Sequence, residues 1–337
     1  MKKVFLLIIL LSGFLQVHSQ NTCTDQLRAA QTKFDEGSLD EIPQLIEACM
    51  KEGFTDEEKT NAYKLLIQTY LFNEQPEKAD EVMLQFLREF PSYALAVNDP
   101  KEFVNLYGTY RTKPIMKFQI TGGMSLGMPA VTENFSLGNT ETAKTKYTPM
   151  PGLMTEINYI NTINRIFDYS IGGSFSWLRY GYTSTPLEFT EVTGTYSNMY
   201  VGMPLTVRYN YKFGKGGLAI RAGIEPVYLL SSKVELTRKD ITRPDPITGT
   251  EDFTSYHNKI DIRPVVSMGL NFKIRKLEFL VTAGMKFGSI NVVNKEKIED
   301  NEVVQQKYSF IEDRMILHQS YISISYMFSI YKPKKIR

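Results

Sequence analysis

The feature that most constrains this sequence is a repeated alternation of apolar and polar residues between positions 117 and 331. Eight segments carry the alternation, and the gaps between them are long and short in turn. The long gaps span 129–150, 183–197, 232–258 and 290–316, and the short gaps span 161–164, 214–217 and 275–276. A soluble sandwich has no reason to sort its loops by length, whereas a membrane barrel has tight turns at one end and long loops at the other. The rhythm predicts an eight-stranded antiparallel transmembrane β-barrel over residues 115–331.

Within each segment, one parity is apolar and the other is polar or small. The third segment, for example, places Phe167, Tyr169 and Ile171 on one parity and serine or glycine on the other. Alternation of this kind is typical of a strand whose two faces meet different surroundings. Each apolar stripe has about the 9–11 residues that a tilted strand needs to cross a bilayer, so we expect the apolar parity to face lipid.

Aromatic residues gather at the segment ends that border the short gaps. If those gaps are periplasmic turns, the aromatics form the interfacial girdle of a membrane barrel. β-Propensity alone would also enrich aromatics in strands, but it gives no reason for them to gather at one end. The predicted periplasmic girdle comprises Tyr159, Phe167, Tyr169, Tyr209, Tyr211, Phe213, Tyr326 and Phe328. A sparser outer girdle is predicted from Trp177, Tyr200, Tyr228 and Phe287.

The polar parity also carries four acids and four bases. They are Glu156, Arg208, Arg221, Glu225, Asp261, Arg263, Glu278 and Lys286. Charges inside a barrel must pair or be solvated, and eight strands enclose a space that side chains just fill. We therefore expect an ion-paired network that fills the interior, which argues against a porin. A proton or ion path is the alternative, and nothing beyond the charges themselves supports it.

The first 19 residues have the organisation of a secretory signal peptide. Lys2 and Lys3 precede the apolar run Phe5–Leu11, and small residues lead to a cleavage site after Ser19. The apolar run is too short for a transmembrane helix. We therefore expect the chain to be exported and residues 1–19 to be removed.

Cleavage would leave a chain without net charge. The chain has 39 basic and 37 acidic residues, and loss of the two lysines of the signal peptide leaves 37 of each sign. A neutral chain gives no argument for a nucleic-acid partner. No motif for binding a dinucleotide, a phosphate, zinc or a redox centre stands out, so we predict no catalytic residues, no cofactor and no metal.

Residues 20–110 change to the period of an α-helix and predict antiparallel helical hairpins. The first hairpin turns near Gly37, and Cys23 and Cys49, the two cysteines of the chain, lie at similar distances on either side of that turn. An antiparallel hairpin would bring them together at its open end, where an oxidising compartment favours a disulfide. Two independent buried thiols are the alternative.

A second predicted hairpin begins with the helix start at Thr55 and turns at 73–75, where Pro76 opens its second helix. Its apolar spacing and closing proline, Pro91, resemble a tetratricopeptide (TPR) repeat with a loose period. Two such hairpins make either a protein-binding groove or a simple four-helix domain, and the pattern leaves both open. No long linker separates this domain from the barrel, and residues 332–337 predict a basic periplasmic tail.

These features together resemble the PorT-type outer-membrane β-barrel proteins of the Bacteroidota. The resemblance covers about residues 117–331 and rests on the strand pattern. The stretch Tyr321–Phe328 is similar to the terminal strand that outer-membrane assembly machinery reads, although the chain continues past it as Lys332–Arg337. The resemblance implies a place in the cell outer membrane, with the N-terminal domain in the periplasm. Some members of the group are implicated in type IX secretion or gliding.

Three functions are compatible with this reading of the sequence. We favour a non-enzymatic barrel that anchors a periplasmic protein-binding domain, as an accessory or scaffold subunit of a secretion, assembly or envelope complex. The expected partners are outer-membrane lipid and a periplasmic or outer-membrane protein. The alternative is a ligand-binding or adhesive surface made by the long loops. A barrel enzyme would need an acid–base group or nucleophile at the outer rim, where His257 and His318 are expected to be solvated.

Overall fold

A computed structural model of the chain describes residues 22–135, 145–164, 166–187, 189–214, 216–242, 245–274, 277–297 and 302–336. The predicted signal peptide and the short gap at 275–276 lie outside these residues. The chain divides into a helical unit, which includes residues 22–115 and 330–336, and a barrel unit of residues 116–329. No helix among the described residues is long and apolar enough to cross a membrane.

The helical unit begins with a helix over residues 22–35, followed by η1 (Leu39–Glu41), α2 (Ile42–Lys51), α3 (Asp56–Phe72), α4 (Pro76–Glu89) and α5 (Lys101–Tyr107). Thr55 starts α3 with a capping box, in which Thr55 and Glu58 each accept a hydrogen bond from the other's backbone amide. Pro76 occupies the first turn of α4, where its missing N–H leaves no helical bond unmade. Local sequence signals therefore set both helix starts.

Helix α3 takes part in both apolar cores of the helical unit. One core lies between the first helix, α2 and α3 and contains Ala30, Ile42, Ile46, Ala62, Leu65 and Leu66. The other is richer in aromatics and contains Tyr63, Ile67, Met83, Phe86, Leu87, Phe90, Phe103, Tyr107 and Tyr110. The predicted disulfide is present: it joins Cys23 of the first helix to Cys49 of α2, with Cα atoms 5.7 Å apart. Because α3 contributes side chains to both cores, it joins them into one unit.

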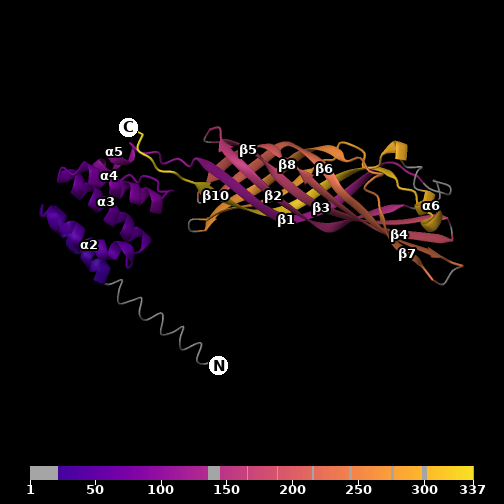
Figure 1. The fold of residues 1–337 in the computed structure, drawn as a ribbon, viewed down its shortest axis with the longest axis horizontal. Coiled ribbons are helices and arrows are strands. Elements are labelled where there is room, and N and C mark those ends of the chain that lie inside the picture. The colour runs from indigo at the N-terminus through magenta and orange to yellow at the C-terminus, as the bar shows by residue number, and fades with distance from the viewer. Residues whose placement is uncertain are drawn as a thin grey trace, which may run out of the picture. The chain divides into compact units, whose positions relative to one another are not determined.

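The C-terminal residues 330–336 belong to the helical unit and pair with the segment that precedes the barrel (Figure 1). The Arg111 amide donates to the Lys334 carbonyl at 2.9 Å. Lys335 forms an ion pair with Asp80 of α4. The segment predicted as a basic tail is thus bound along the helical unit, so the two chain segments that lead to the barrel are paired with each other.

The barrel unit is an antiparallel sheet closed into a ring of eight strand positions (Figure 1). Its strands are β1 (Met116–Glu133), β2 (Lys146–Thr162), β3 (Phe167–Leu187), β4 (Thr190–Gly202), β5 (Leu205–Phe213), β6 (Gly216–Asp240), β8 (Ile260–Ile274), β9 (Leu277–Lys286) and β10 (Arg314–Ile330). Strand β10 neighbours β1, which closes the ring, and β4 and β5 share the position between β3 and β6. The eight-stranded antiparallel barrel predicted from the gap rhythm is confirmed.

The fourth predicted strand is divided into β4 and β5, which the sequence pattern did not anticipate. Pro204 stands in the interruption and has no N–H to give to a sheet ladder. Its carbonyl still accepts a hydrogen bond from the Gly172 amide of β3 at 3.3 Å. On the other side, the Met203 amide donates to the Pro226 carbonyl of β6 at 2.9 Å. Backbone bonds therefore keep the ring closed across the interruption.

Two of the gaps predicted as long loops are largely strand. Strand β3 runs to Leu187 and β4 begins at Thr190, so they fill the gap at 183–197 as a hairpin. In the gap at 232–258, β6 continues to Asp240 and β7 (Ile247–Asp252) pairs back onto it. Strand β6 therefore has 25 residues, far more than the roughly 9–11 that cross a bilayer.

The other two long gaps are loops in part. The gap at 290–316 contains η2 (Lys295–Lys297) and α6 (Glu302–Tyr308). In the gap at 129–150, β1 continues into the gap from one side and β2 begins within it, and residues 136–144 lie outside the described residues. The long-gap end of the barrel is therefore built from regular structure as well as loops.

Along the extended strands, the two faces of the sheet exchange polarity. The outward residues of β3 are apolar up to Trp177 and no longer apolar from Arg179 onward, while its inward residues are small and polar up to Ser176 and mainly apolar from Leu178. On β4, the outward residues change from apolar to polar between Met199 and Ser197. A strand in uniform surroundings has no reason to exchange its faces, so this level marks a change of solvent around the barrel.

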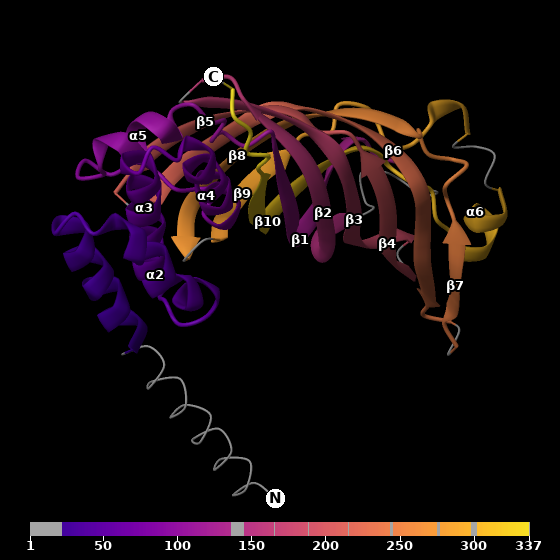
Figure 2. The same ribbon diagram turned by 60° about the vertical axis from the view of Figure 1, so that its left-hand side comes forward.

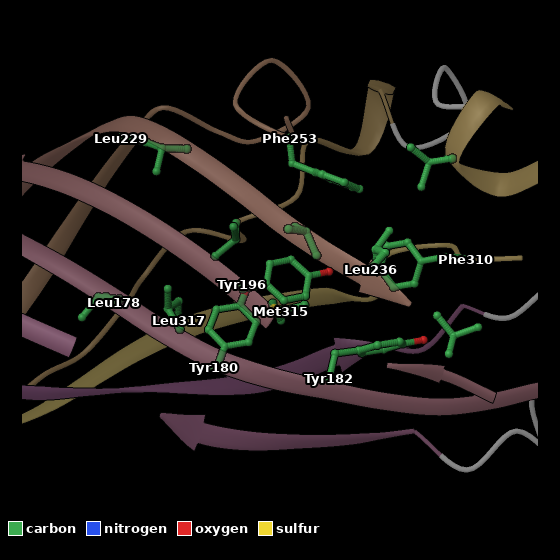
Figure 3. Close-up of a cluster of buried hydrophobic side chains, with 14 of the residues drawn as sticks. Leu178, Tyr180, Tyr182, Tyr196, Leu229, Leu236, Phe253, Phe310, Met315 and Leu317 are labelled. Atoms are coloured by element: carbon green, nitrogen blue, oxygen red, sulfur yellow. The ribbon is translucent and has the colours of Figure 1, made fainter. Parts of the chain in front are cut away.

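Beyond that level, the inward side chains form an apolar core (Figure 3). The rings of Tyr180 and Tyr196 stack with centroids 4.4 Å apart, and Tyr182 meets Phe310 edge-on at 5.0 Å. Helix α6 lies beside β7 at this end, where Tyr308 donates to Glu251 at 2.9 Å (Figure 2). The long-gap end of the barrel is therefore filled by a core of its own, which we call the outer core.

Candidate functional site

Four charged side chains of the predicted network meet in the middle of the barrel interior. Lys286 Nζ lies 2.8 Å from Glu156 and 2.7 Å from Glu225, and Arg221 lies 2.9 Å from Glu156. The side chains of Lys286, Glu156 and Glu225 are no more than 1% exposed. Two acids and two bases balance in charge, which is the condition under which buried ionised groups are tolerated.

Neutral groups complete the hydrogen bonds of this central cluster. Ser174 donates to Glu225, and Arg221 donates to the Tyr321 hydroxyl at 2.8 Å. The members come from β2, β3, β6, β9 and β10, which lie all around the ring. The cluster therefore joins strands across the interior and opposes sliding of their register.

Two smaller charge groups flank the central cluster. Towards the short-gap end, Arg208 pairs with Asp168 at 3.0 Å. Towards the outer core, Arg263 pairs with Asp261 at 3.1 Å and lies over the Tyr200 ring at 4.2 Å. The assignment of Tyr200 to an outer girdle is therefore wrong, because its ring points inward to stack on Arg263.

The predicted set of interior charges omitted Asp168 and included Glu278, which has a smaller role. The signal for Asp168 was present, because it has the same parity as Ser170 and the alternation therefore places it inward. Glu278 lies half-buried on the inner parity of β9 but joins none of these three groups among the described contacts. Seven of the eight predicted charges thus divide into three local groups rather than one network.

One cavity between these groups is small. A cavity of about 10 Å³ lies among hydroxyl, amide and guanidinium groups of the short-gap half, including Gln119, Thr121, Arg208 and Ser325. That volume is about the size of one water molecule. Among the described residues, no group of three or more histidine, cysteine, aspartate or glutamate side chains is arranged to hold a metal ion.

The predicted girdle aromatics lie on the outward face near the short gaps. Six rings touch in series across five strands, with centroids 5.5 to 6.0 Å apart. In order they are Tyr159, Phe118, Phe328, Tyr326, Phe279 and Phe272. Phe167 packs on Tyr209 at 5.5 Å, and Tyr211 lies 6.4 Å from Phe213. Tyr169 is also outward and 41% exposed. A band of rings of this kind suits the interface between lipid and water.

The expectation that His257 is a solvated rim histidine is wrong. Its side chain is buried, and Nε2 lies 2.9 Å from both carboxylate oxygens of Glu312. The Phe253 ring of the outer core packs beside it at 6.0 Å. His318 accepts a hydrogen bond from the Gly288 amide at 3.1 Å. Sequence spacing gave no signal that Glu312, 55 positions from His257, would reach it.

The helical unit contains a groove with a volume of about 400 Å³. Its lining is rich in amide and charged side chains, and it lies between the first helix, α3 and the turn that precedes α5. The lining residues are Thr24, Leu27, Arg28, Gln31, Glu58, Asn61, Lys64, Leu65, Gln68, Asn98, Asp99 and Pro100. Amide side chains offer a donor and an acceptor at the same position, which matches the alternating groups of a peptide backbone.

An ion pair between Lys64 and Asp99 forms one wall of this groove. The two side chains approach to 2.7 Å and are 15% and 1% exposed. Burial works against the charge of Asp99, but hydrogen bonds from Lys64, the Ala96 amide and Tyr93 outweigh it and lower the pKa of Asp99. The pKa of Lys64 is raised, because the contacts with Asp99 and Tyr93 outweigh its burial. Both groups are therefore held in their charged forms.

Comparison with known proteins gives structural likenesses without a family. No protein family matches the chain. No curated protein sequence matches it either. Among solved structures, the chain is similar to the outer membrane protein OprG of Pseudomonas aeruginosa, with 9% identity and a TM-score of 0.35 over 64% of this chain and 97% of that chain. It is also similar to Ail, the attachment invasion locus protein of Yersinia pestis, with 14% identity and a TM-score of 0.30 over 63% and 99%.

A third likeness is to Neisserial surface protein A, with 10% identity and a TM-score of 0.30 over 63% of this chain and 97% of that chain. The barrel assignment itself rests on the strand pairings of this chain, which close the ring without reference to any relative.

Proposed function

We propose that the chain is a non-enzymatic outer-membrane β-barrel, of the PorT type that its strand pattern resembles, which anchors a protein-binding helical unit in the periplasm. The observation that carries the proposal is the filled interior, where Lys286, Glu156 and Glu225 are almost wholly buried in one ion-paired cluster. A barrel filled in this way is suited to holding something in place. The outward apolar residues of the strands, which we call the membrane belt, and the girdle support membrane insertion. Closure of the ring supports it as well, because a closed barrel leaves no unpaired edge in lipid.

The barrel itself offers a direct test of this reading. We expect the purified protein to give no steady ion conductance in a planar lipid bilayer, because the central cluster and the outer core occupy the interior in series. A stable conductance lost on replacement of a central-cluster residue would favour the ion-path alternative. In cells, the protein should fractionate with the outer membrane, and its absence there would contradict the placement.

The groove of the helical unit is the proposed partner site. Its amides and its paired charges favour an extended polar segment of a protein, bound through the backbone as well as through side chains. A volume of about 400 Å³ is within the range of sites that hold a small ligand or a short stretch of peptide. An accessory or scaffold role in a secretion, assembly or envelope complex follows if that protein belongs to such a complex.

Site-directed photo-crosslinking in the full-length protein tests the partner site. A photoreactive residue at Gln68, which lines the groove, should capture one defined protein in intact cells. The matched control is Gln85 on α4, an exposed glutamine outside the groove lining. Capture at both positions, or at neither, would contradict a groove-bound partner.

A second candidate function is a binding surface at the long-gap end. The observation that favours it is the outer core, since Tyr180, Tyr196 and Phe310 hold the extended hairpins in a fixed shape. A rigid surface binds with a smaller entropic cost than mobile loops do. Loss of cell adhesion after replacement of outward residues on β3 and β4, with partner capture at Gln68 unchanged, would support this function over the first.

A further inference from the structure

Three polar side chains lie in one row across β3, β4 and β6, directly above the level where the faces of the barrel exchange polarity. Arg179 is opposite Ser197, and Ser197 is opposite Lys233, so all three project from the same outward face. The row below contains Trp177 and Met199. Neighbouring strands are about 4.8 Å apart, so the backbones of Arg179 and Lys233 are about 10 Å apart with Ser197 between them. Side chains as long as these can meet over the serine.

Trp177 orients two members of the row. Its indole N–H donates to Ser197 Oγ at 2.7 Å, and its ring lies 5.2 Å from the Arg179 guanidinium. Because Ser197 Oγ already accepts this hydrogen bond, its own proton is directed elsewhere and can be donated to an outside acceptor. A guanidinium, a hydroxyl and an ammonium group then stand side by side as donors, which is the donor set that binds an oxyanion.

Lys233 faces outward because of a β-bulge. Below the bulge, Val227 and Leu229 face inward, so uninterrupted alternation would turn Lys233 inward as well. The register between β4 and β6 shifts at this point, and Leu230 is the extra residue. Above it, Val234 faces inward and Lys233 faces outward. Bulges re-aim side chains in this way beside functional sites.

One acid lies beside the row, and a second lies in the row above it. Asp252 of β7 is opposite Lys233, and its carboxylate accepts a hydrogen bond from the Thr254 amide at 2.8 Å. Glu235 lies two residues further along β6, in the row above. On the other side, Arg179 is opposite Met150 of β2. The row itself therefore has two cations and one flanking carboxylate.

We propose that Arg179, Ser197 and Lys233 bind the phosphate of a glycolipid in the outer leaflet of the outer membrane. The level of the row supports this ligand, because the exterior below it is apolar and the exterior above it is polar, as at the plane of lipid headgroups. The inference goes beyond the anchoring role and rests on the outer-membrane placement proposed above. It gives the barrel a fixed lipid contact on one side of its circumference.

Lipid retention by the full-length protein tests the site. Purified protein in detergent is titrated with bisphosphorylated lipid A, and the bound lipid is counted by native mass spectrometry. The test variant is Arg179→Gln with Lys233→Gln, and the matched control is Lys146→Gln with Lys239→Gln, which removes two exposed cations from the same face at higher rows. We expect one tightly held lipid A on the wild type and on the control. Affinity should fall about fivefold for each cation removed, so about 25-fold in the test variant.

Two further arms decide between lipid sources and protect the test from misfolding. Dephosphorylated lipid A should not be retained, and equal binding of phosphatidylglycerol would overturn the assignment to a glycolipid. Each variant is checked for the heat-dependent gel mobility of a folded barrel, and Lys233→Arg should keep the affinity. Equal lipid A binding by the test variant and the control overturns the site while leaving the anchoring role intact. Absence of the wild type from the outer membrane overturns both.

Discussion

At the scale of single residues, Lys286 has the most demanding position in the barrel. Its ammonium group lies between the carboxylates of Glu156 and Glu225, and its side chain is 1% exposed. Without it, two buried negative charges would face each other with Arg221 as the remaining cation. The alternation of the sequence placed these residues inside the barrel, but their mutual contacts depend on the register of β2, β6 and β9 around the ring.

Replacement of Lys286 by methionine should destabilise the barrel by about 3–5 kcal/mol, because it leaves a buried carboxylate without its partner. The measurement is unfolding of the purified protein by urea in detergent micelles. Lys212→Met, at an exposed position of β5, is the control and should change little. Adding Glu225→Gln to Lys286→Met should recover part of the loss. Equal stability of Lys286→Met and the control would contradict a buried ion-paired cluster.

The ion pair of the helical unit predicts a dependence on pH. The pKa of Asp99 is lowered from its usual 3.8, so its stabilising effect is present above that value and is lost as pH falls through the lower, folded-state pKa. Asp99→Asn should destabilise the helices by about 2 kcal/mol near neutral pH. The difference from wild type should shrink in acid below the usual pKa. Thermal loss of the helical circular dichroism at several pH values measures this stability difference. A difference that does not depend on pH would contradict a charged Asp99 in the ion pair.

At the scale of elements, the long strands are the main departure from what the pattern predicted. Strands β3, β4 and β6 continue past the level of Trp177 with inverted faces, so their far ends behave as a soluble sheet around an apolar core. The sequence does contain the inversion, since outward threonines and inward Val192 and Tyr196 occupy the predicted gap 183–197. A pattern that requires one apolar parity throughout a strand predicts a loop where the parity inverts.

The outer core should open independently of the membrane belt. Phe310 is 2% exposed and packs against Tyr182 and Phe253, so Phe310→Ala should cost about 3–5 kcal/mol through a cavity and lost burial. We expect faster proteolysis of the β3–β4 and β6–β7 hairpins in intact cells. Protease resistance of the remaining barrel and its gel mobility should be unchanged. Loss of the protease resistance and gel mobility of the remaining barrel, together with proteolysis of the hairpins, would show that the outer core and the membrane belt unfold as one.

At the scale of the whole molecule, the chain consists of two compact units whose stabilities rest on different physics. The barrel unit closes its own hydrogen bonds in a ring, and the helical unit depends on two cores that share α3 and on one disulfide. Residues 330–336 pair with the segment before the barrel and belong to the helical unit.

Reduction of the disulfide should affect one unit only. Replacing Cys23 and Cys49 with serine removes a cross-link that spans 26 residues, which should lower the stability of the helical unit by about 3 kcal/mol. The helical circular dichroism should melt at a lower temperature, while the heat-dependent gel mobility of the barrel stays as in wild type. A matched shift in the barrel would contradict the independence of the units.

The sequence by itself determined the number of strand positions in the ring, the faces of the residues in the membrane-level part of the strands, the disulfide and the starts of α3 and α4. These follow from local rules, since alternation, capping and the spacing about a turn need no knowledge of distant residues. Only the tertiary structure decided which charges meet, that Glu312 reaches His257, and that a bulge at Leu230 turns Lys233 outward. Those outcomes depend on strand register and on closure of the ring, which bring together residues that no local pattern connects.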